Sequence, residues 1–187
     1  VWDGRPAIVM ELVEGVTLSK MLSQGPLSPT DALPMLDQLL DAVGYAHDRG
    51  IVHRDISPDN LMMENGRIRL IDFGCARQPE KGEVTMTIIL KHGYAPIEQY
   101  TNRGQGPWTD VYALSATLYF CLMGKTPPRS IDRALDDELI LPRKLGVPLT
   151  EEQEQALITG MGVTRRQRFN SVAELYAALY QTAEPDP

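Results

Sequence analysis

One stretch decides how this chain is interpreted: His53-Arg54-Asp55-Ile56-Ser57-Pro58-Asp59-Asn60, followed twelve residues later by Asp72-Phe73-Gly74. Asn65-Gly66 lies between them, and this pair favours a two-residue hairpin turn because both of its residues tolerate positive φ. A hairpin brings its two ends together, so we expect Asn60 and Asp72 to lie side by side. Amide and carboxylate oxygens are ligands that suit Mg²⁺ together with substrate phosphates. The stretch therefore predicts a phosphoryl-transfer site.

Composition excludes several other classes of protein. The 187 residues fit one compact domain, and a formal net charge of −7 argues against general nucleic-acid binding. The two cysteines, Cys75 and Cys121, have no zinc or disulfide spacing, so we expect a reducing, cytoplasmic setting. The longest apolar run, residues 111–123, is too short to span a bilayer and predicts a core helix, not a membrane segment. The chain begins without Met, which we interpret as a fragment boundary.

Periodicity and capping residues predict a mainly α (α+β) fold with a small β-hairpin surface. Apolar residues three and four apart, together with Ser, Thr, Gly and Pro at the helix ends, mark the helices. A short apolar run predicts one buried strand before them. The expected elements are a strand at 7–13, helices at 18–22 and 29–50, the hairpin at 61–71, a helix at 108–123, weak helix at 132–139, and helices beginning near 151 and 172.

The residue types of the central stretch match what phosphoryl transfer requires. The reaction needs positioning and cations more than covalent chemistry from the protein. A carboxylate near the acceptor hydroxyl can orient it and take its proton, and we assign this role to Asp55. Asn60 and Asp72 are the candidate metal ligands. An isolated Asp beside Gly is usually a turn, but this spacing of three such residues around a hairpin rarely arises by chance.

With these residues the chain resembles the eukaryotic-type Ser/Thr protein kinases, in particular those of bacteria. The resemblance runs through nearly the whole chain in the order of the family's motifs. It rests on His53-Arg54-Asp55 with Asn60, Asp72-Phe73-Gly74, Gly93-Tyr94-Ala95-Pro96-Ile97-Glu98-Gln99-Tyr100, Thr109-Asp110-Val111-Tyr112-Ala113-Leu114, and Arg168-Phe169. It implies a structural role for His53 and Phe73, a brace of the loop backbone by Asp110, and an ion pair between Glu98 and Arg168.

The same resemblance implies the ligands and a division of the chain. ATP is the expected nucleotide, with Mg²⁺, or Mn²⁺ in its place, as the ion and a protein as the phosphate acceptor. Met10 would be the gatekeeper, the backbones of Glu11 and Val13 would meet adenine, and Met62 would pack beneath it. Residues 1–13 would be the last small-lobe strand and the hinge, 14–182 the large lobe, and 183–187 a tail or linker.

Arg54 and two threonines form a further expectation. In the family this arginine often receives the phosphate of a modified loop residue, through a charge-assisted contact. Thr85 and Thr87 are therefore candidate phosphorylation sites in an activation loop, and Arg54 is their candidate partner.

The sequence departs from the family pattern in four respects. It contains no Gly-x-Gly-x-x-Gly and no strand lysine before Met10. Ser57 stands where Ser/Thr kinases usually carry a lysine that reaches the γ-phosphate. Lys91 stands near a position where threonine is common. We therefore expect this chain by itself to bind nucleotide poorly and to turn over little.

Two other classes remain open. The first is a pseudokinase-type binding module, which the presence of Asp55, Asn60 and Asp72 disfavours. The second is a small-molecule phosphotransferase, which shares an Asp-x-x-x-x-Asn loop but is disfavoured by Arg54 and Arg168. We also expect self-association through the apolar surface that a small lobe would cover, formed by Met10, Leu12, Met62 and Phe73.

Overall fold

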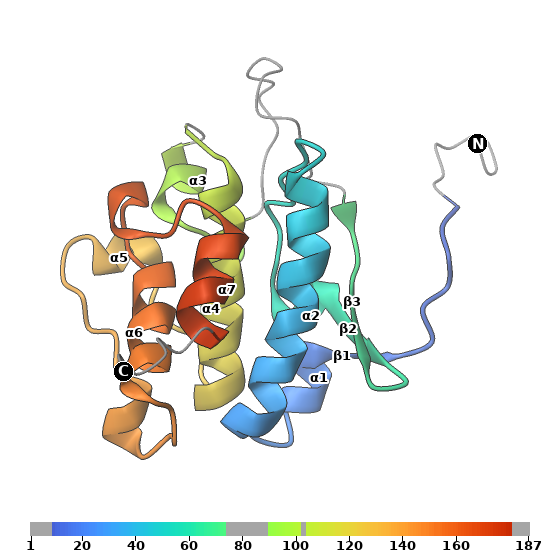
Figure 1. Ribbon diagram of the computed structural model, residues 1–187, viewed down its shortest axis with the longest axis horizontal. Helices are drawn as coiled ribbons and strands as arrows, with labels where there is room; N and C mark the ends of the chain where they lie inside the picture. The colour runs from blue at the N-terminus through green and yellow to red at the C-terminus, as the bar shows by residue number, and fades with distance from the viewer. Residues whose placement is uncertain (1–8, 74–89, 102–103, 181–187) are drawn as a thin grey trace, which may run out of the picture.

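The computed structural model describes residues 9–73, 90–101 and 104–180 (Figure 1). Helices make up most of this part of the chain, and a small antiparallel sheet lies on one side, so the predicted mainly α class is confirmed. The helices are α1 Leu18–Leu22, α2 Pro29–His47, α3 Ile97–Thr101, α4 Pro107–Met123, α5 Ser130–Arg133, α6 Glu151–Gly160 and α7 Val172–Tyr180. The 3₁₀ turns are η1 Pro58–Asn60, η3 Pro142–Leu145 and η4 Arg165–Gln167, and the strands are β1 Val16–Thr17, β2 Leu61–Glu64 and β3 Arg67–Leu70.

The predicted helix starts are confirmed by their caps. Thr17, Ser28 and Thr150 each accept a hydrogen bond from a backbone N–H in the first turn of α1, α2 and α6. Ser171 does the same for α7 by accepting from the N–H of Glu174 at 3.2 Å. These bonds satisfy donors that the first helical turn otherwise leaves unpaired. The weak helix expected at 132–139 is instead the shorter α5, which begins earlier and ends at Arg133.

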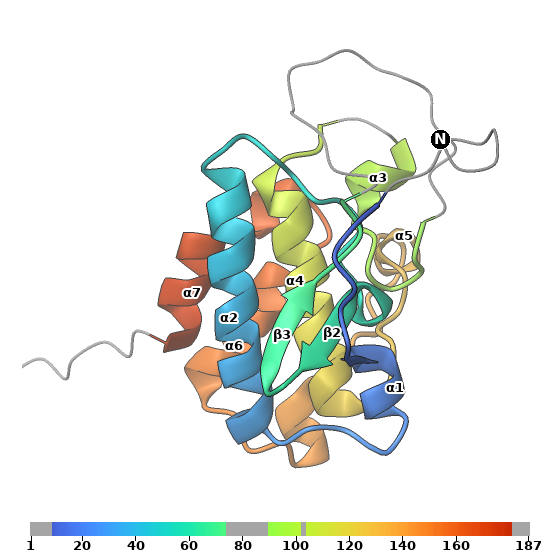
Figure 2. The ribbon, with the colours of Figure 1, turned by 90° about the vertical axis from the view of Figure 1, so that its right-hand side faces the viewer.

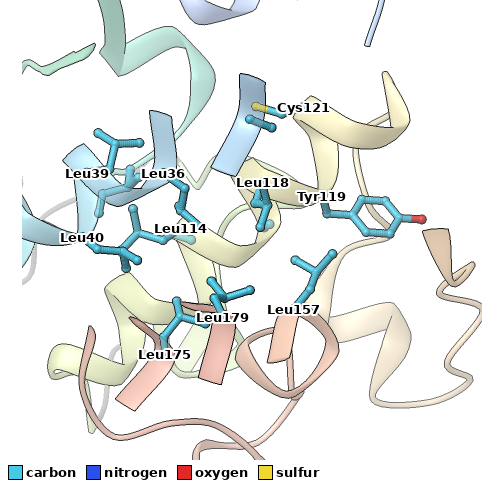
Figure 3. Close-up of a cluster of buried hydrophobic side chains, with 14 of the residues drawn as sticks. Leu36, Leu39, Leu40, Leu114, Leu118, Tyr119, Cys121, Leu157, Leu175 and Leu179 are labelled. Atoms are coloured by element: carbon cyan, nitrogen blue, oxygen red, sulfur yellow. The ribbon is translucent and has the colours of Figure 1, made fainter. Parts of the chain in front are cut away.

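Helix α4 is the centre of the core. Residues 109–119 are all buried, and α2, α6 and α7 pack around the helix. Figure 3 shows leucines of these four helices meeting, with Leu114 and Leu118 of α4 among them. Gly160 of α6 lies so close to Ser115 of α4 that a Cβ at that position would collide with the serine. A helix that is apolar on nearly every side must be buried on nearly every side, which explains why it lies between its neighbours.

The hairpin is confirmed and lies against α2 (Figure 2). Its turn has Asn65 at φ 50° and Gly66 at φ 77°, as a two-residue turn of this kind requires. The strand order is β1-β2-β3, with β1 antiparallel to β2. Beyond the strands, the N–H of Ile71 donates to the carbonyl of Asn60 at 2.9 Å. The two ends of the hairpin therefore meet.

The strand predicted for residues 7–13 is wrong over its described part. Residues 9–13 form no strand, and Val9, Met10 and Leu12 are 97%, 71% and 79% exposed. Figure 1 shows this segment extending away from the sheet beyond β1. A strand needs a neighbouring strand to pair its backbone groups, and within the described part of the chain residues 9–13 pair with none of the three strands. Apolar composition alone therefore misled the prediction.

Among the residues that the structure describes, no helix combines the length and apolarity needed to cross a membrane. Helix α4, which contains the longest apolar run in the sequence, is a core helix as expected. Cys121 lies within it as a free, buried cysteine, and burial raises the pKa of its thiol to about 12. Cys75 lies outside the described residues.

Candidate active site

Residues 53–60, called loop 53–60 below, are held by one buried carboxylate from α4. Asp110 is fully buried and accepts hydrogen bonds from the backbone N–H groups of His53 and Arg54, each at 2.8 Å. Arg54 has φ 70°, a left-handed conformation that non-glycine residues rarely adopt. Such a conformation persists only when its surroundings enforce it. Asp110 is thus one of the groups that fix the strained start of the loop.

Two further contacts, which sequence reasoning missed, fix the same region. His47, in the last turn of α2, shares a 2.8 Å hydrogen bond between its Nε2 atom and Asp110 Oδ2. Gln99 of α3 donates from Nε2 to the carbonyl of Arg54 at 2.7 Å. His47 lies 63 residues from Asp110 along the chain, so no local pattern points to this pair. Helices α3 and α4 therefore contact the first residues of loop 53–60 directly, and α2 contacts the Asp110 side chain that holds them.

Asp55 and Asn60 lie together within the loop. The Asn60 amide nitrogen donates to both the backbone carbonyl and the Oδ2 atom of Asp55, each at 2.8 Å. Both bonds use the nitrogen, so the Asn60 Oδ1 atom lies on the other side of the amide group and remains available as an acceptor. Asp55 is thereby held in one orientation while part of its carboxylate stays accessible.

The hairpin brings Asp72 to the same place. Its neighbour Ile71 is bonded through the backbone to Asn60, and Asp72 itself has φ 63°. An amide oxygen from Asn60 and a carboxylate from Asp72 would together supply oxygen ligands, which suit a hard cation such as Mg²⁺ that keeps several waters or phosphate oxygens as its other ligands. In the described ranges, no group of three or more His, Cys, Asp or Glu side chains could hold a metal by itself.

His53 and Phe73 lie in contact beneath this site. Their rings meet edge to face, with centroids 4.6 Å apart and an interplanar angle of 65°. His53 is 1% exposed, and its Nδ1 atom accepts from the N–H of Asp55 at 3.3 Å. Burial lowers the pKa of His53, against the opposing effect of Asp110 and Asp55. A neutral imidazole that accepts from the loop backbone is consistent with a supporting role. Phe73 is half exposed.

Glu98 and Arg168 form a buried ion pair that links α3 to the C-terminal part of the chain. Two bonds of 2.8 and 2.7 Å join Arg168 Nη1 to Glu98 Oε1 and Arg168 Nη2 to Oε2. The arginine also donates to the carbonyls of Trp108 and Val163, and Thr109 donates to Glu98. Both terminal nitrogens of the arginine and both oxygens of the glutamate are therefore hydrogen-bonded, and buried charges are tolerated when they are paired in this way.

The expected nucleotide contacts are only partly assembled. Met62 lies in β2, half-buried, whereas Met10 is 71% exposed on the segment that extends away from the sheet. The Glu11 carboxylate accepts from Arg69 of β3 at 3.0 Å. Val13 is half-buried beside them. The adenine contacts of these four residues therefore stay a prediction.

Thr85 and Thr87 lie outside the described residues, so the modification expected there also stays a prediction. Ser57 and Lys91, noted in the sequence as departures, are in contact: the Lys91 ammonium donates to Ser57 Oγ at 2.9 Å. The sequence shows each departure separately. Their contact across 34 residues appears only in the fold.

This arrangement defines a class: a helical large lobe carrying a loop aspartate, an adjacent asparagine and a hairpin aspartate. The protein kinase domain family matches residues 3–159 of the chain. The chain belongs to this family.

Individual proteins to which the chain is similar include kinases. The chain is 33% identical to sperm motility kinase 2B of Mus musculus over 153 residues, which cover 77% of this chain and 32% of that protein. It is 37% identical to the serine/threonine-protein kinase PknL of Mycobacterium tuberculosis over 130 residues, 67% of this chain and 33% of PknL. A solved structure, the apo form of PpkA-294, matches with TM-score 0.77 and 31% identity over 90% of this chain and 61% of its own. The chain thus spans about a third of these curated relatives.

Proposed function

We propose that this chain carries the phosphoryl-transfer residues of a Ser/Thr protein kinase, which moves the γ-phosphoryl group of ATP to a Ser or Thr hydroxyl of a protein. The observation that supports this most directly is the pair of 2.8 Å bonds from Asn60 to Asp55, in a loop whose backbone is bonded to Asp110. A carboxylate held in one orientation can direct a hydroxyl toward phosphorus.

In this mechanism Asp55 accepts the proton of the acceptor hydroxyl. The hydroxyl oxygen forms a bond to the γ-phosphorus while the bond from that phosphorus to the β–γ bridging oxygen breaks, and ADP leaves with the electron pair. Asn60 has a second role, because its Oδ1 atom and the Asp72 carboxylate would hold Mg²⁺. The ion would neutralise charge on the phosphate oxygens. Arg54 would bind the phosphate of a modified Thr85 or Thr87.

The partners and setting are part of the same proposal. ATP would contact Met10, Glu11, Val13 and Met62, and the acceptor would be a protein. Because the 187 residues contain no glycine-rich phosphate loop, we expect them alone to transfer phosphate much more slowly than an intact protein kinase. A cytoplasmic location stays a prediction.

The test is phosphate transfer from radiolabelled ATP, by autophosphorylation and to casein, with the full-length protein. Asp55→Asn keeps the shape of the side chain but removes the base, so kcat should fall by about 100-fold or more. The matched control is Asp132→Asn, which changes an exposed aspartate on α5 and should leave kcat unchanged. Equal rates for Asp55→Asn and the parent would refute Asp55 as the base. A parent that binds ATP but transfers no phosphate would favour the pseudokinase alternative.

A further inference from the structure

We propose that Lys91 supplies the γ-phosphate cation of this site from a segment outside loop 53–60. The inference rests on the proposed function. It deepens that function by adding a residue that neither the motif comparison nor the family match assigns. In the sequence, position 57 lacks the expected lysine, whereas the structure brings a lysine to the side chain of that same position.

The position of Lys91 is well defined. Its backbone carbonyl accepts from the N–H groups of Tyr94 and Ala95, at 3.1 and 3.0 Å. At the other end, its ammonium donates to Ser57 Oγ at 2.9 Å. Ser57 is fully buried and precedes η1, the turn that ends at Asn60. The lysine is therefore anchored both by its backbone and by its tip.

The two residue types have exchanged places. The resemblance implies a lysine at 57 and makes a hydroxyl residue common near 91, whereas this chain has Ser57 and Lys91. Because the two side chains are in contact, an exchange keeps an ammonium and a hydroxyl at the same junction. Loss of the lysine at position 57 alone would not explain why another lysine side chain contacts Ser57.

The ammonium retains donors for a ligand. A lysine has three N–H donors, and the bond to Ser57 uses one of them. The Asp59 carboxylate lies 3.8 Å from the ammonium and is 65% exposed, so this ion pair is long and solvated. Exposed pairs of this kind contribute little and are readily given up to a stronger anion. The Lys91 side chain is 28% exposed and thus accessible to such an anion.

The lysine is also close to the proposed base. Asp55 and Lys91 line one small pocket of about 10 Å³, room for roughly one water molecule, together with Arg54 and Tyr94. Asp55 in this pocket and Asp59 beside the ammonium already supply carboxylates at the junction, and a phosphoryl group arriving there brings more negative charge. A cation aimed at developing charge in a partly dehydrated site stabilises the transition state more than the ground state.

A purely structural tie between Lys91 and Ser57 is the competing interpretation, and the two differ in kinetics. If the contact is only structural, removing the lysine should lower the melting temperature and weaken the binding of ATP and metal. If the lysine binds the γ-phosphate, removing it should lower mainly kcat, because its contact with the phosphate strengthens in the transition state. The KM for ATP and the melting temperature would then change little.

The experiment compares variants of the full-length protein for kcat, KM for ATP and melting temperature. Lys91→Met should lower kcat on the order of 100-fold, with KM and melting nearly unchanged. The matched control, Lys144→Met, alters an exposed lysine of η3 and should have no effect. The deciding variant is the transposed pair Ser57→Lys with Lys91→Ser. It should recover most of the kcat that Lys91→Ser alone loses.

The outcomes separate this inference from the proposed function. Active parent protein with an unchanged kcat in Lys91→Met would overturn the inference and leave the proposed function intact. The inference would also be overturned if the transposed pair had a kcat no higher than that of Lys91→Ser, or if the fall in kcat only followed a fall in melting temperature. Inactivity of the parent itself would overturn the proposed function and this inference with it. Recovery of kcat in the transposed pair supports it.

Discussion

Replacing Arg168 with Met should destabilise the protein severely because it leaves a buried carboxylate without its partner. The Arg168 side chain is 0% exposed and that of Glu98 only 10%. The change removes two bonds to Glu98 and the donors for the carbonyls of Trp108 and Val163. The Thr109 hydroxyl would remain as a hydrogen-bond donor to the glutamate.

Removing one member of a buried ion pair costs about 3–5 kcal/mol. For a chain of this length each kcal/mol moves the melting midpoint by about 2–4 °C, so Arg168→Met should lower it by roughly 10 °C. Glu98→Leu combined with Arg168→Met should be less destabilising than Arg168→Met alone, because no buried charge is then left unpaired.

Thermal melting and urea unfolding followed by circular dichroism measure both effects. The matched control is Arg129→Met, which breaks the exposed pair with Asp132 on α5 and should leave the midpoint almost unchanged. If Arg168→Met moved the midpoint no further than this control, the buried pair would not hold α3 to the C-terminal part of the chain. A double variant as unstable as Arg168→Met would contradict the role given to the unpaired carboxylate.

Three further outcomes are expected. Burial lowers the pKa of His53 from 6.5 in the folded state, so the stability it contributes is complete above pH 6.5 and is lost as pH falls below that value. Urea midpoints measured across this range should therefore decline less in His53→Gln. Burial raises the pKa of Cys121 to about 12, so in a Cys75→Ser background iodoacetamide should not modify it near neutral pH until urea unfolds the chain. Self-association of the 187-residue chain should rise with concentration in analytical ultracentrifugation and weaken in Leu12→Glu, which charges a side chain that is 79% exposed; a strictly monomeric parent would contradict it.

Local signals predicted the local structure well. Thr17, Ser28 and Thr150 precede helices because a side-chain oxygen bonds a backbone donor only a few residues away. Asn65-Gly66 predicted the hairpin because its two φ angles are properties of the turn itself. Each of these predictions depends on a physical cause contained within about four residues.

Long-range contacts leave no such local signal, and the two that were expected, those of Asp110 and of Glu98 with Arg168, came from the family resemblance. Nothing in the sequence near His47 indicates that it binds Asp110, and nothing near Ser57 indicates that Lys91 reaches it. The strand expected at 7–13 failed for a related reason, since pairing depends on what lies beside a segment and not on its own composition. The sequence and its resemblance to kinases therefore indicated the candidate site residues, the Asp110 brace and the pair of Glu98 with Arg168. They did not indicate the contacts of His47 and Gln99.

The support of loop 53–60 explains why such a site needs a large helical body. Arg54 has a strained φ of 70°, a conformation that costs free energy wherever it occurs. The strain is offset by two hydrogen bonds, in which the Arg54 N–H donates to Asp110 of α4 and Gln99 of α3 donates to the Arg54 carbonyl. Asn60 in turn fixes the orientation of Asp55. These groups come from separate segments, and their mutual distances depend on the packing of α4 against its neighbours. A change in the core that tilts α4 should therefore lower the rate of transfer even where it touches none of the reacting groups.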